Sequence, residues 1–274
     1  QTCPKPTVEE AIKEAIPLAE KALEEGAQFL FLPEYSGGLK SDKGALTPPA
    51  FSEEKHMFLS TFKEFSRKNN VWLMIGSIAI KGQAGKIINR GFVIDDEGIV
   101  RSRYDKIHLF DIQISNSEIY RESSFVSPGN ESVLVHTKYA IIGHSICYDI
   151  RFPHLFRDLS KAGAEILCVP AAFLRKTGQA HWHVLNRARA IENCAYVISA
   201  CAVGPIPGGG ESFGHSLIIG PWGEVIADGG ADRGIIVANI DLDAVADIRS
   251  RIPSLTHDRL FTLKKGSKRS KKCL

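Results

Sequence analysis

The chain has 274 residues, 44% of them hydrophobic, which is enough to bury a large core in one big α/β domain or in two smaller ones. Its longest apolar runs stop well short of the ~20 residues that a membrane-spanning helix needs, which speaks against a membrane protein. The net charge of +3 comes from residues 264–274, which hold six Lys and Arg. Residues 1–263 carry 28 basic and 31 acidic groups, a net charge of −3. A slightly acidic body argues against a nucleic-acid partner.

Helices and strands alternate in the first half of the chain. The hydrophobic pattern predicts an amphipathic helix over residues 8–25, an apolar strand at 29–32 and a second amphipathic helix over 51–69. A buried strand at 71–78 follows. A hairpin at 92–100, with glycine in its turn, completes this half.

The second half repeats this order. Gly-Ala-Gln-Phe-Leu-Phe-Leu-Pro at 26–33 resembles Gly-Ala-Glu-Ile-Leu-Cys-Val-Pro at 163–170. The predicted elements are a strand at 139–146, a helix over 152–162, a strand within 163–170, a helix over 180–193, a strand at 196–202 and a hairpin at 217–225. Two similar α/β halves, each with helices on one face of its sheet, predict a four-layer α-β-β-α sandwich.

One strand of this pattern lacks a counterpart. A strand precedes the helix at residue 152, whereas almost nothing precedes the helix that begins at Val8. The symmetry predicts that the first strand of the fold is missing and would end near Gln1. The chain starts with Gln rather than Met and shows no signal-peptide pattern, so we expect that its first residues were removed or not included. We expect residues 1–263 to form one domain and residues 264–274 to form a disordered basic tail.

Cys147 is the first candidate for chemistry. It follows the apolar strand 140–146 and precedes Pro153, which suits the first turn of a helix. A thiol at a strand-to-helix turn projects from the sheet beside backbone N–H groups, and these should stabilise its thiolate. The alternative is a buried structural cysteine, as expected for three other cysteines in apolar runs.

Three charged residues are further candidates. Glu34 follows the strand at 29–32 and Pro33, at the carboxyl end of the strand, where open α/β sheets collect functional side chains. Lys106 and Glu122 follow the first hairpin. From position alone, an ordinary surface side chain is the alternative for each of the three.

These residues lie in motifs that together resemble the nitrilase superfamily. The motifs are Leu-Pro-Glu at 32–34, Tyr-Asp-Lys-Ile-His-Leu-Phe-Asp at 104–111, Arg-Glu-Ser-x-x-x-x-Pro-Gly at 121–129 and Cys-Tyr-Asp-x-Arg-Phe-Pro at 147–153. Within the superfamily, the set resembles the branch of omega-amidases and deaminated-glutathione amidases. The resemblance spans most of the chain; the amino-terminal strand, the loop at 203–210 and the basic tail lie outside it.

The resemblance implies a catalytic triad of Glu34, Lys106 and Cys147, with Glu122 as an additional carboxylate. Glu34 would move protons while Cys147 attacks a carboxamide carbon and passes through a thioester. Lys106 and the backbone N–H of Tyr148 would hold the oxyanion of the tetrahedral intermediates. Glu122 would orient Lys106 or position the water.

The implied function is an amidase that releases ammonia from a small carboxylate-bearing amide, such as the omega-amide of a 2-oxo acid or deaminated glutathione. We assign Tyr148, Arg151 and Phe173 as candidate substrate contacts. Two alternatives are a nitrilase or carbamoyl-amide hydrolase of the same superfamily, and a non-catalytic interaction module on the same fold. The resemblance also implies a homodimer or higher homo-oligomer, assembled through the helices at 152–162 and 180–193.

No cofactor and no metal is expected. His181 and His183 flank Trp182, but no nearby Cys or His completes a metal site, and the resemblance treats this stretch as structural. Six cysteines without C-x-x-C spacing are typical of a reducing, intracellular protein. We expect a cytoplasmic location, with mitochondria and peroxisomes as alternatives.

Overall fold

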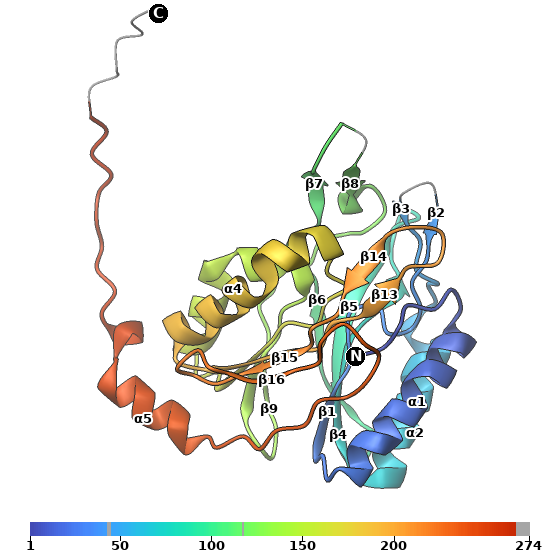
Figure 1. Cartoon of the computed structure of the whole chain (residues 1–274), viewed down its shortest axis with the longest axis horizontal. Helices are drawn as coiled ribbons and strands as arrows, with labels where there is room; N and C mark the ends of the chain where they lie inside the picture. Colours follow the sequence, from blue (N-terminus) through green and yellow to red (C-terminus); the bar gives the residue numbers. More distant parts are fainter. Residues whose placement is uncertain (43–44, 117, 267–274) are drawn as a thin grey trace, which may run out of the picture.

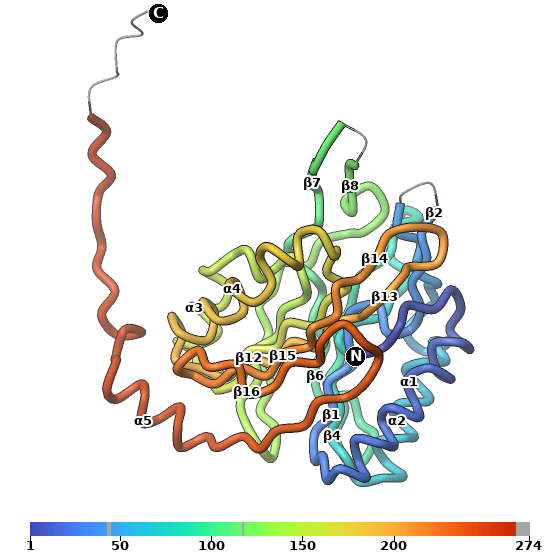
Figure 2. Tube along the Cα trace, in the orientation of Figure 1, coloured from blue at the N-terminus to red at the C-terminus, as the bar shows by residue number. Residues whose placement is uncertain are grey.

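Two β-sheets lie face to face, and helices cover the outer side of each (Figure 1, Figure 2). The computed structural model describes residues 1–42, 45–116 and 118–266; residues 267–274 of the tail expected to be disordered lie outside the described part. The first sheet contains, in spatial order, β1 (Phe29–Phe31), β4 (Trp72–Lys81), β5 (Ile87–Ile94) and β6 (Val100–Asp105). The second sheet contains β16 (Val225–Asp228), β15 (Leu217–Ile219), β12 (Tyr196–Ser199), β11 (Ile166–Cys168), β10 (Ile141–Gly143) and β9 (Leu134–His136).

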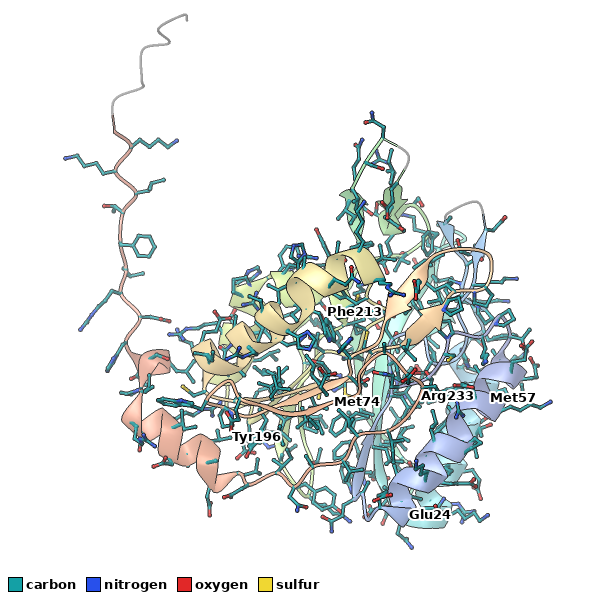
Figure 3. All side chains as sticks on the ribbon, viewed as in Figure 1. Glu24, Met57, Met74, Tyr196, Phe213 and Arg233 are labelled. Atoms are coloured by element: carbon teal, nitrogen blue, oxygen red, sulfur yellow. The ribbon has the colours of Figure 1, made fainter. Side chains whose placement is uncertain are left out.

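Three buried apolar clusters hold the layers together. The helices are α1 (Val8–Glu24), α2 (Met57–Asn69), α3 (Pro153–Lys161), α4 (Arg175–Asn193) and α5 (Asp243–Arg251). Helices α1 and α2 pack on the first sheet through one cluster, and α3 and α4 pack on the second sheet through another. The third cluster lies between the sheets and includes Met74 and Tyr196, both labelled in Figure 3. These layers confirm the predicted α-β-β-α sandwich of two similar halves.

Shorter elements connect the layers. Three two-stranded hairpins are β2 (Ser41–Asp42) with β3 (Ala45–Leu46), β7 (Asp111–Gln113) with β8 (Ile119–Arg121), and β13 (Val203–Pro205) with β14 (Glu211–Phe213). Figure 1 shows them at the same end of the sandwich. The described residues also form the 3-10 helices η1 (Glu53–Lys55), η2 (Glu122–Ser124), η3 (Cys147–Arg151) and η4 (Ser254–Thr256). Within residues 1–266 as described, no helix combines the length and apolar character needed to cross a bilayer.

Two helices begin at other residues than predicted. Helix α4 begins at Arg175, several residues early, and continues through Gly178. A Cβ at position 178 would lie 2.4 Å from the ring of Phe213, so tight packing requires glycine where helix propensity argues against it. Helix α2 begins at Met57 and not at residue 51, because Phe51 forms a bridge with strand β4. Helix α5 has no counterpart in the prediction.

The strand expected to be missing has no counterpart among residues 1–7. In the second half, β10 precedes α3 and pairs in parallel with β11. In the first half, the one partner of β1 among the described strands is β4. A cavity of about 430 Å³ lies beside β1 and is also lined by α1 and by the segment from Ile235 to Ile240. The two halves therefore differ at this edge.

Gly76 of β4 permits a close approach of the two halves. A Cβ at this position would lie 2.1 Å from the carbonyl oxygen of Leu32, 2.5 Å from that of Pro33 and 2.4 Å from the Cβ of Pro170. Pro33 follows β1 and Pro170 follows β11, which are corresponding strands of the two halves. The segments that follow these two strands therefore both pack against Gly76. Glu34 comes directly after this contact.

Candidate active site

An ammonium group lies buried between two carboxylates. Nζ of Lys106 is 2.9 Å from Oε1 of Glu34, and 3.1 and 2.9 Å from the two carboxylate oxygens of Glu122. The three residues are 2%, 4% and 5% exposed, respectively. Because buried charges are unfavourable unless they are paired and hydrogen-bonded, the three groups depend on one another.

Strand ends and a short turn bring these side chains together. Glu34 follows β1, Lys106 follows β6, and Glu122 begins η2. Strands β1 and β4 are parallel, and β5 is antiparallel to both β4 and β6, so β1 and β6 run in the same direction. Their carboxyl ends therefore reach the same edge of the sheet, where open α/β folds place functional groups.

Four neutral donors fix the two carboxylates. They are Asn89 Nδ2 and the Ala172 N–H on Glu34, both at 2.9 Å, and the Phe110 N–H at 2.6 Å and the Tyr35 hydroxyl at 3.2 Å on Glu122. These hydrogen bonds hold both carboxylates in place beside the Lys106 ammonium. None of the four was predicted from the sequence, because two donate through the backbone, the Asn89 side chain lies inside a strand, and Tyr35 lies in a loop and binds Glu122, which is far along the chain.

Cys147 begins η3 just beyond β10, at the strand-to-helix turn that the sequence predicted. Its φ is 50°, a left-handed conformation that is uncommon for a residue with a side chain. Asp149 holds the turn: it accepts hydrogen bonds from the Ile146 N–H at 2.8 Å, the Tyr104 hydroxyl at 2.7 Å and the His108 N–H at 3.0 Å. Asp149 thus connects the motif at 147–153 to the motif at 104–111. This role of Asp149 was not predicted from the sequence.

The resting Cys147 is a thiol, not a thiolate. Burial raises its pKa well above the ordinary value, and the Glu34 carboxylate, which is hydrogen-bonded to the thiol, raises it further. Lys106 acts in the opposite direction but does not reverse the shift. The prediction of a stabilised thiolate is therefore wrong, because desolvation and a neighbouring anion outweigh the backbone N–H groups. A proton acceptor, Glu34, lies next to the thiol.

Lys106 keeps its positive charge in spite of its burial. Burial by itself lowers the pKa of a lysine, but the carboxylates of Glu122 and Glu34 outweigh this effect. They hold the pKa of Lys106 well above its ordinary value. A permanent cation thus faces the side of the site where Glu34 and Cys147 meet.

The four side chains line one cavity of about 260 Å³. Its apolar wall is formed by Leu46, Phe110, Ile119, Phe125, Leu174 and Ile206, several of them in or next to the hairpins at that end of the sandwich. The volume and the apolar wall suit a small organic substrate. Glu34, Lys106, Glu122 and Cys147, predicted as one site, are thus brought together.

The predicted substrate contacts are placed differently. Tyr148 and Phe173 line the cavity, but Arg151 is not among the described residues that do. The guanidinium of Arg151 lies over the rings of these two residues, 5.8 and 5.5 Å from their centroids, and its Nη2 is 3.3 Å from Nδ1 of His181. Arg121, at the end of β8, is a lining cation that the sequence analysis did not select.

Comparison with known proteins agrees with this geometry. The family model described as carbon-nitrogen hydrolase matches residues 1–250. The chain belongs to the carbon-nitrogen hydrolase family. It is therefore a hydrolase of carbon–nitrogen bonds other than peptide bonds, and the predicted resemblance to the nitrilase superfamily and to its omega-amidase and deaminated-glutathione amidase branch is confirmed.

Individual members of this family resemble the chain over nearly its whole length. A deaminated glutathione amidase of Synechocystis sp. (strain PCC 6803 / GT-S) is 38% identical over 268 residues, which cover 95% of this chain and 96% of the relative. An omega-amidase of Xenopus tropicalis is 36% identical, with 90% of this chain and 89% of the relative covered. The crystal structure of Nit3 from Saccharomyces cerevisiae, a member of branch 10 of the nitrilase superfamily, has a TM-score of 0.82 at 28% identity and covers 94% of this chain and 93% of its own.

Two substitutions should separate the electrostatic effects on Cys147. Glu34→Gln removes the anion that raises the thiol pKa, so iodoacetamide should alkylate Cys147 at neutral pH as fast as in the unchanged protein or faster. Lys106→Met removes the cation that lowers this pKa, and each unit of further increase should slow alkylation about tenfold. Mass spectrometry of the Cys147 peptide measures both rates. Equal slowing in the two variants would contradict these opposite effects.

Proposed function

We propose that the protein hydrolyses a small carboxylate-bearing carboxamide to the acid and ammonia through a thioester on Cys147. The observation that carries this proposal is the contact of a neutral thiol with the Glu34 carboxylate, beside the Lys106 ammonium, at one small cavity. A thiol needs an adjacent base to become a nucleophile, and the developing oxyanion needs a fixed positive charge. Both partners are present.

The first half-reaction forms the thioester. As Sγ of Cys147 bonds to the carboxamide carbon, its proton moves to Glu34 and the carbonyl electron pair moves onto oxygen. Lys106 and the backbone N–H of Tyr148 stabilise this oxyanion, and a preorganised donor of this kind is worth about 3 to 4 kcal/mol. Glu34 then returns the proton to the amide nitrogen, and the carbon–nitrogen bond breaks to release ammonia.

The second half-reaction reuses the same groups. Glu34, again ionised, takes a proton from water as the water oxygen attacks the thioester carbon. Collapse of the second intermediate breaks the carbon–sulfur bond and returns the proton to Cys147. We assign Glu122 to the orientation of Lys106 rather than to water activation, because its oxygens already accept from Lys106, Tyr35 and the Phe110 N–H.

The substrate class follows from the relatives and from the charges of the cavity. The similar proteins of Synechocystis and Xenopus carry the names deaminated glutathione amidase and omega-amidase. Among the described lining residues, the basic ones are Lys106 and Arg121, and Lys106 is already paired with two carboxylates. We propose that Arg121, exposed at the end of β8, binds the substrate carboxylate, while Tyr148 and Phe173 contact its apolar part.

We also propose a homodimer that forms through α4 and the β15–β16 hairpin. Five large apolar side chains are 40–68% exposed on these elements and the turn between the strands: Val184, Ile191, Trp222, Val225 and Ile226. Apolar groups gathered in this way are typical of a surface that another chain covers.

The five described cysteines are free thiols, in keeping with the reducing cytoplasm that we propose as the location.

The nucleophile can be tested by two cysteine substitutions. Cys147→Ala should lower ammonia release about 10⁴-fold or more, because no other cysteine is among the described residues that line the cavity. Cys168→Ala is the matched control: Cys168 is 1% exposed in the cluster between the sheets, so its loss should cost about 1 kcal/mol of stability and leave turnover unchanged. Substantial turnover by Cys147→Ala would reject the proposed function and favour another nucleophile.

The carboxylate contact can be tested with a matched pair of amides. The omega-amide of a 2-oxo acid and its methyl ester differ in one negative charge. Arg121→Gln should raise the KM of the acid about tenfold, equivalent to about 1.4 kcal/mol, and leave that of the ester unchanged. Arg67→Gln serves as the control, because Arg67 is exposed on α2 and pairs with Glu64. Equal turnover of acid and ester by the unchanged enzyme would refute a carboxylate-selective cavity.

The dimer can be tested by light scattering. Two chains of 30.1 kDa should give a particle of about twice that mass at micromolar concentration. Ile191→Asp places a charge on the apolar face of α4 and should yield monomers. Ile99→Asp, at an equally exposed site in the turn between β5 and β6, should remain dimeric. A monomeric unchanged protein would reject this assembly.

A further inference from the structure

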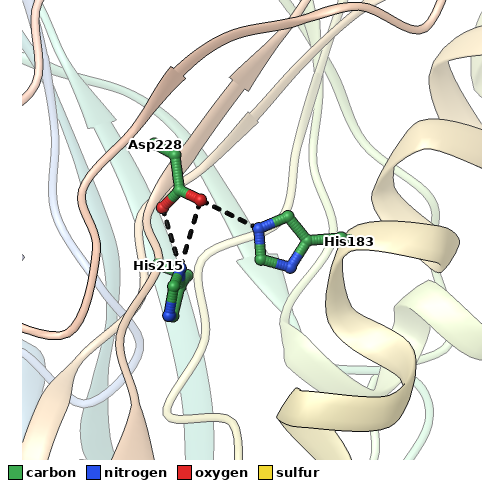
Figure 4. Close-up of side chains that lie close together, drawn as sticks. All are labelled: His183, His215 and Asp228. Atoms are coloured by element: carbon green, nitrogen blue, oxygen red, sulfur yellow. Dashed lines mark hydrogen bonds and ion pairs between the residues drawn. The ribbon is translucent and has the colours of Figure 1, made fainter.

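Two histidines and an aspartate converge outside the cavity of Cys147. Nε2 of His183 is 2.9 Å from Oδ2 of Asp228, and Nδ1 of His215 is 2.9 and 3.1 Å from the two carboxylate oxygens of the same residue (Figure 4). None of the three is among the described residues that line the cavity. The cluster is therefore separate from the site described above.

The three side chains come from three different segments. His183 lies on α4, His215 precedes β15, and Asp228 ends β16. His215 and Asp228 are distant from His183 in the chain, so only the fold brings them near, and the sequence shows no third ligand beside His183. The expectation that no metal site is completed here rested on sequence spacing, and the fold supplies two further potential ligands.

The backbone holds two of the ligands in fixed positions. His215 adopts a left-handed φ of 51°, its N–H donates to the Gly230 carbonyl at 2.7 Å, and its own carbonyl accepts from Nε1 of Trp182 at 2.7 Å. The Gly230 N–H donates to Oδ1 of Asp228 at 2.9 Å. These hydrogen bonds thus hold the segment before β15 and the segment after β16 together around the cluster.

The donor set has the chemistry of a transition-metal site. One ligand atom from each residue lies within 4.8 Å of the others, and tetrahedral ligands at about 2.1 Å from zinc lie about 3.4 Å apart, so small side-chain rotations close the site. Two imidazoles favour Zn²⁺, Co²⁺ or Ni²⁺ over Mg²⁺ and Ca²⁺, which prefer oxygen ligands.

We propose that His183, His215 and Asp228 bind one divalent cation of the zinc class. All three residues are partly exposed in the single chain, which leaves room for a further ligand such as water in the coordination shell. A metal at this place links α4 to the β15–β16 hairpin. Because none of the three residues lines the cavity of Cys147, we expect the ion to act on stability and not in the amide hydrolysis proposed above.

The test measures binding of zinc chloride to the untagged full chain by titration calorimetry after removal of metals with a chelator. Every protein carries Cys147→Ala, so that the active-site thiol does not bind the metal. We expect one zinc ion per chain, an increase in thermal stability with zinc, and no saturable binding of magnesium chloride. Absence of saturable zinc binding would overturn the proposal and leave a hydrogen-bonded triad without a metal.

Substitutions assign the ligands. His183→Ala and Asp228→Asn should each weaken zinc binding at least about tenfold, and Asp228→Asn keeps the shape of the side chain in case the alanine variant does not fold. His181→Ala is the matched control, since it removes an exposed histidine from the same helix and should leave zinc affinity unchanged. Zinc affinity that is unaffected in His183→Ala and Asp228→Asn, or a thiolate charge-transfer band on substitution by cobalt, would place the metal elsewhere and reject this site.

Discussion

The pairing of one buried ammonium with two buried carboxylates is the interaction on which the site depends. Without Glu34 and Glu122, burial would drive Lys106 toward its neutral form. Without Lys106, two carboxylates would lie unpaired in a desolvated pocket, and breaking a buried pair in this way typically costs about 3 to 5 kcal/mol. The ends of β1 and β6 and the start of η2 therefore have to reach the same point. The sheet pairings around them satisfy that requirement, and Asn89 on the strand beside β6 bridges the two carboxylates.

The proposed reaction moves charge within this set without changing its total. At rest the thiol is neutral, so Glu34, Glu122 and Lys106 together carry one net negative charge. When Cys147 attacks, the substrate oxygen becomes negative while Glu34 becomes neutral, and the sum stays the same. A buried site holds little water that could respond to a change in net charge, so a neutral thiol with an adjacent base suits this environment better than a preformed thiolate.

The features that could be predicted from the sequence are those with a local signature. An apolar run followed by Pro and Glu34, or a strand that leads into Cys147, is visible within ten residues, and so are the helices that cover each sheet. Asn89 and Asp149 have no such signature, because their roles depend on partners far along the chain. The direction of the Cys147 pKa shift was mispredicted for the same reason: burial is a property of the whole fold. The meeting of His183 with distant residues likewise depends on tertiary structure.

Gly76 contacts no reacting group, yet it determines how closely the two halves of the catalytic machinery approach. On one side it touches Pro33, the residue before Glu34; on the other it touches Pro170, whose carbonyl accepts the N–H of Cys147 at 2.9 Å. A single methyl group at this position would clash with both segments, one of which leads into Glu34 while the other binds the Cys147 N–H. The spacing between the segments that carry the base and the nucleophile thus depends on a residue without a side chain. At this position there is no room for even one additional carbon atom.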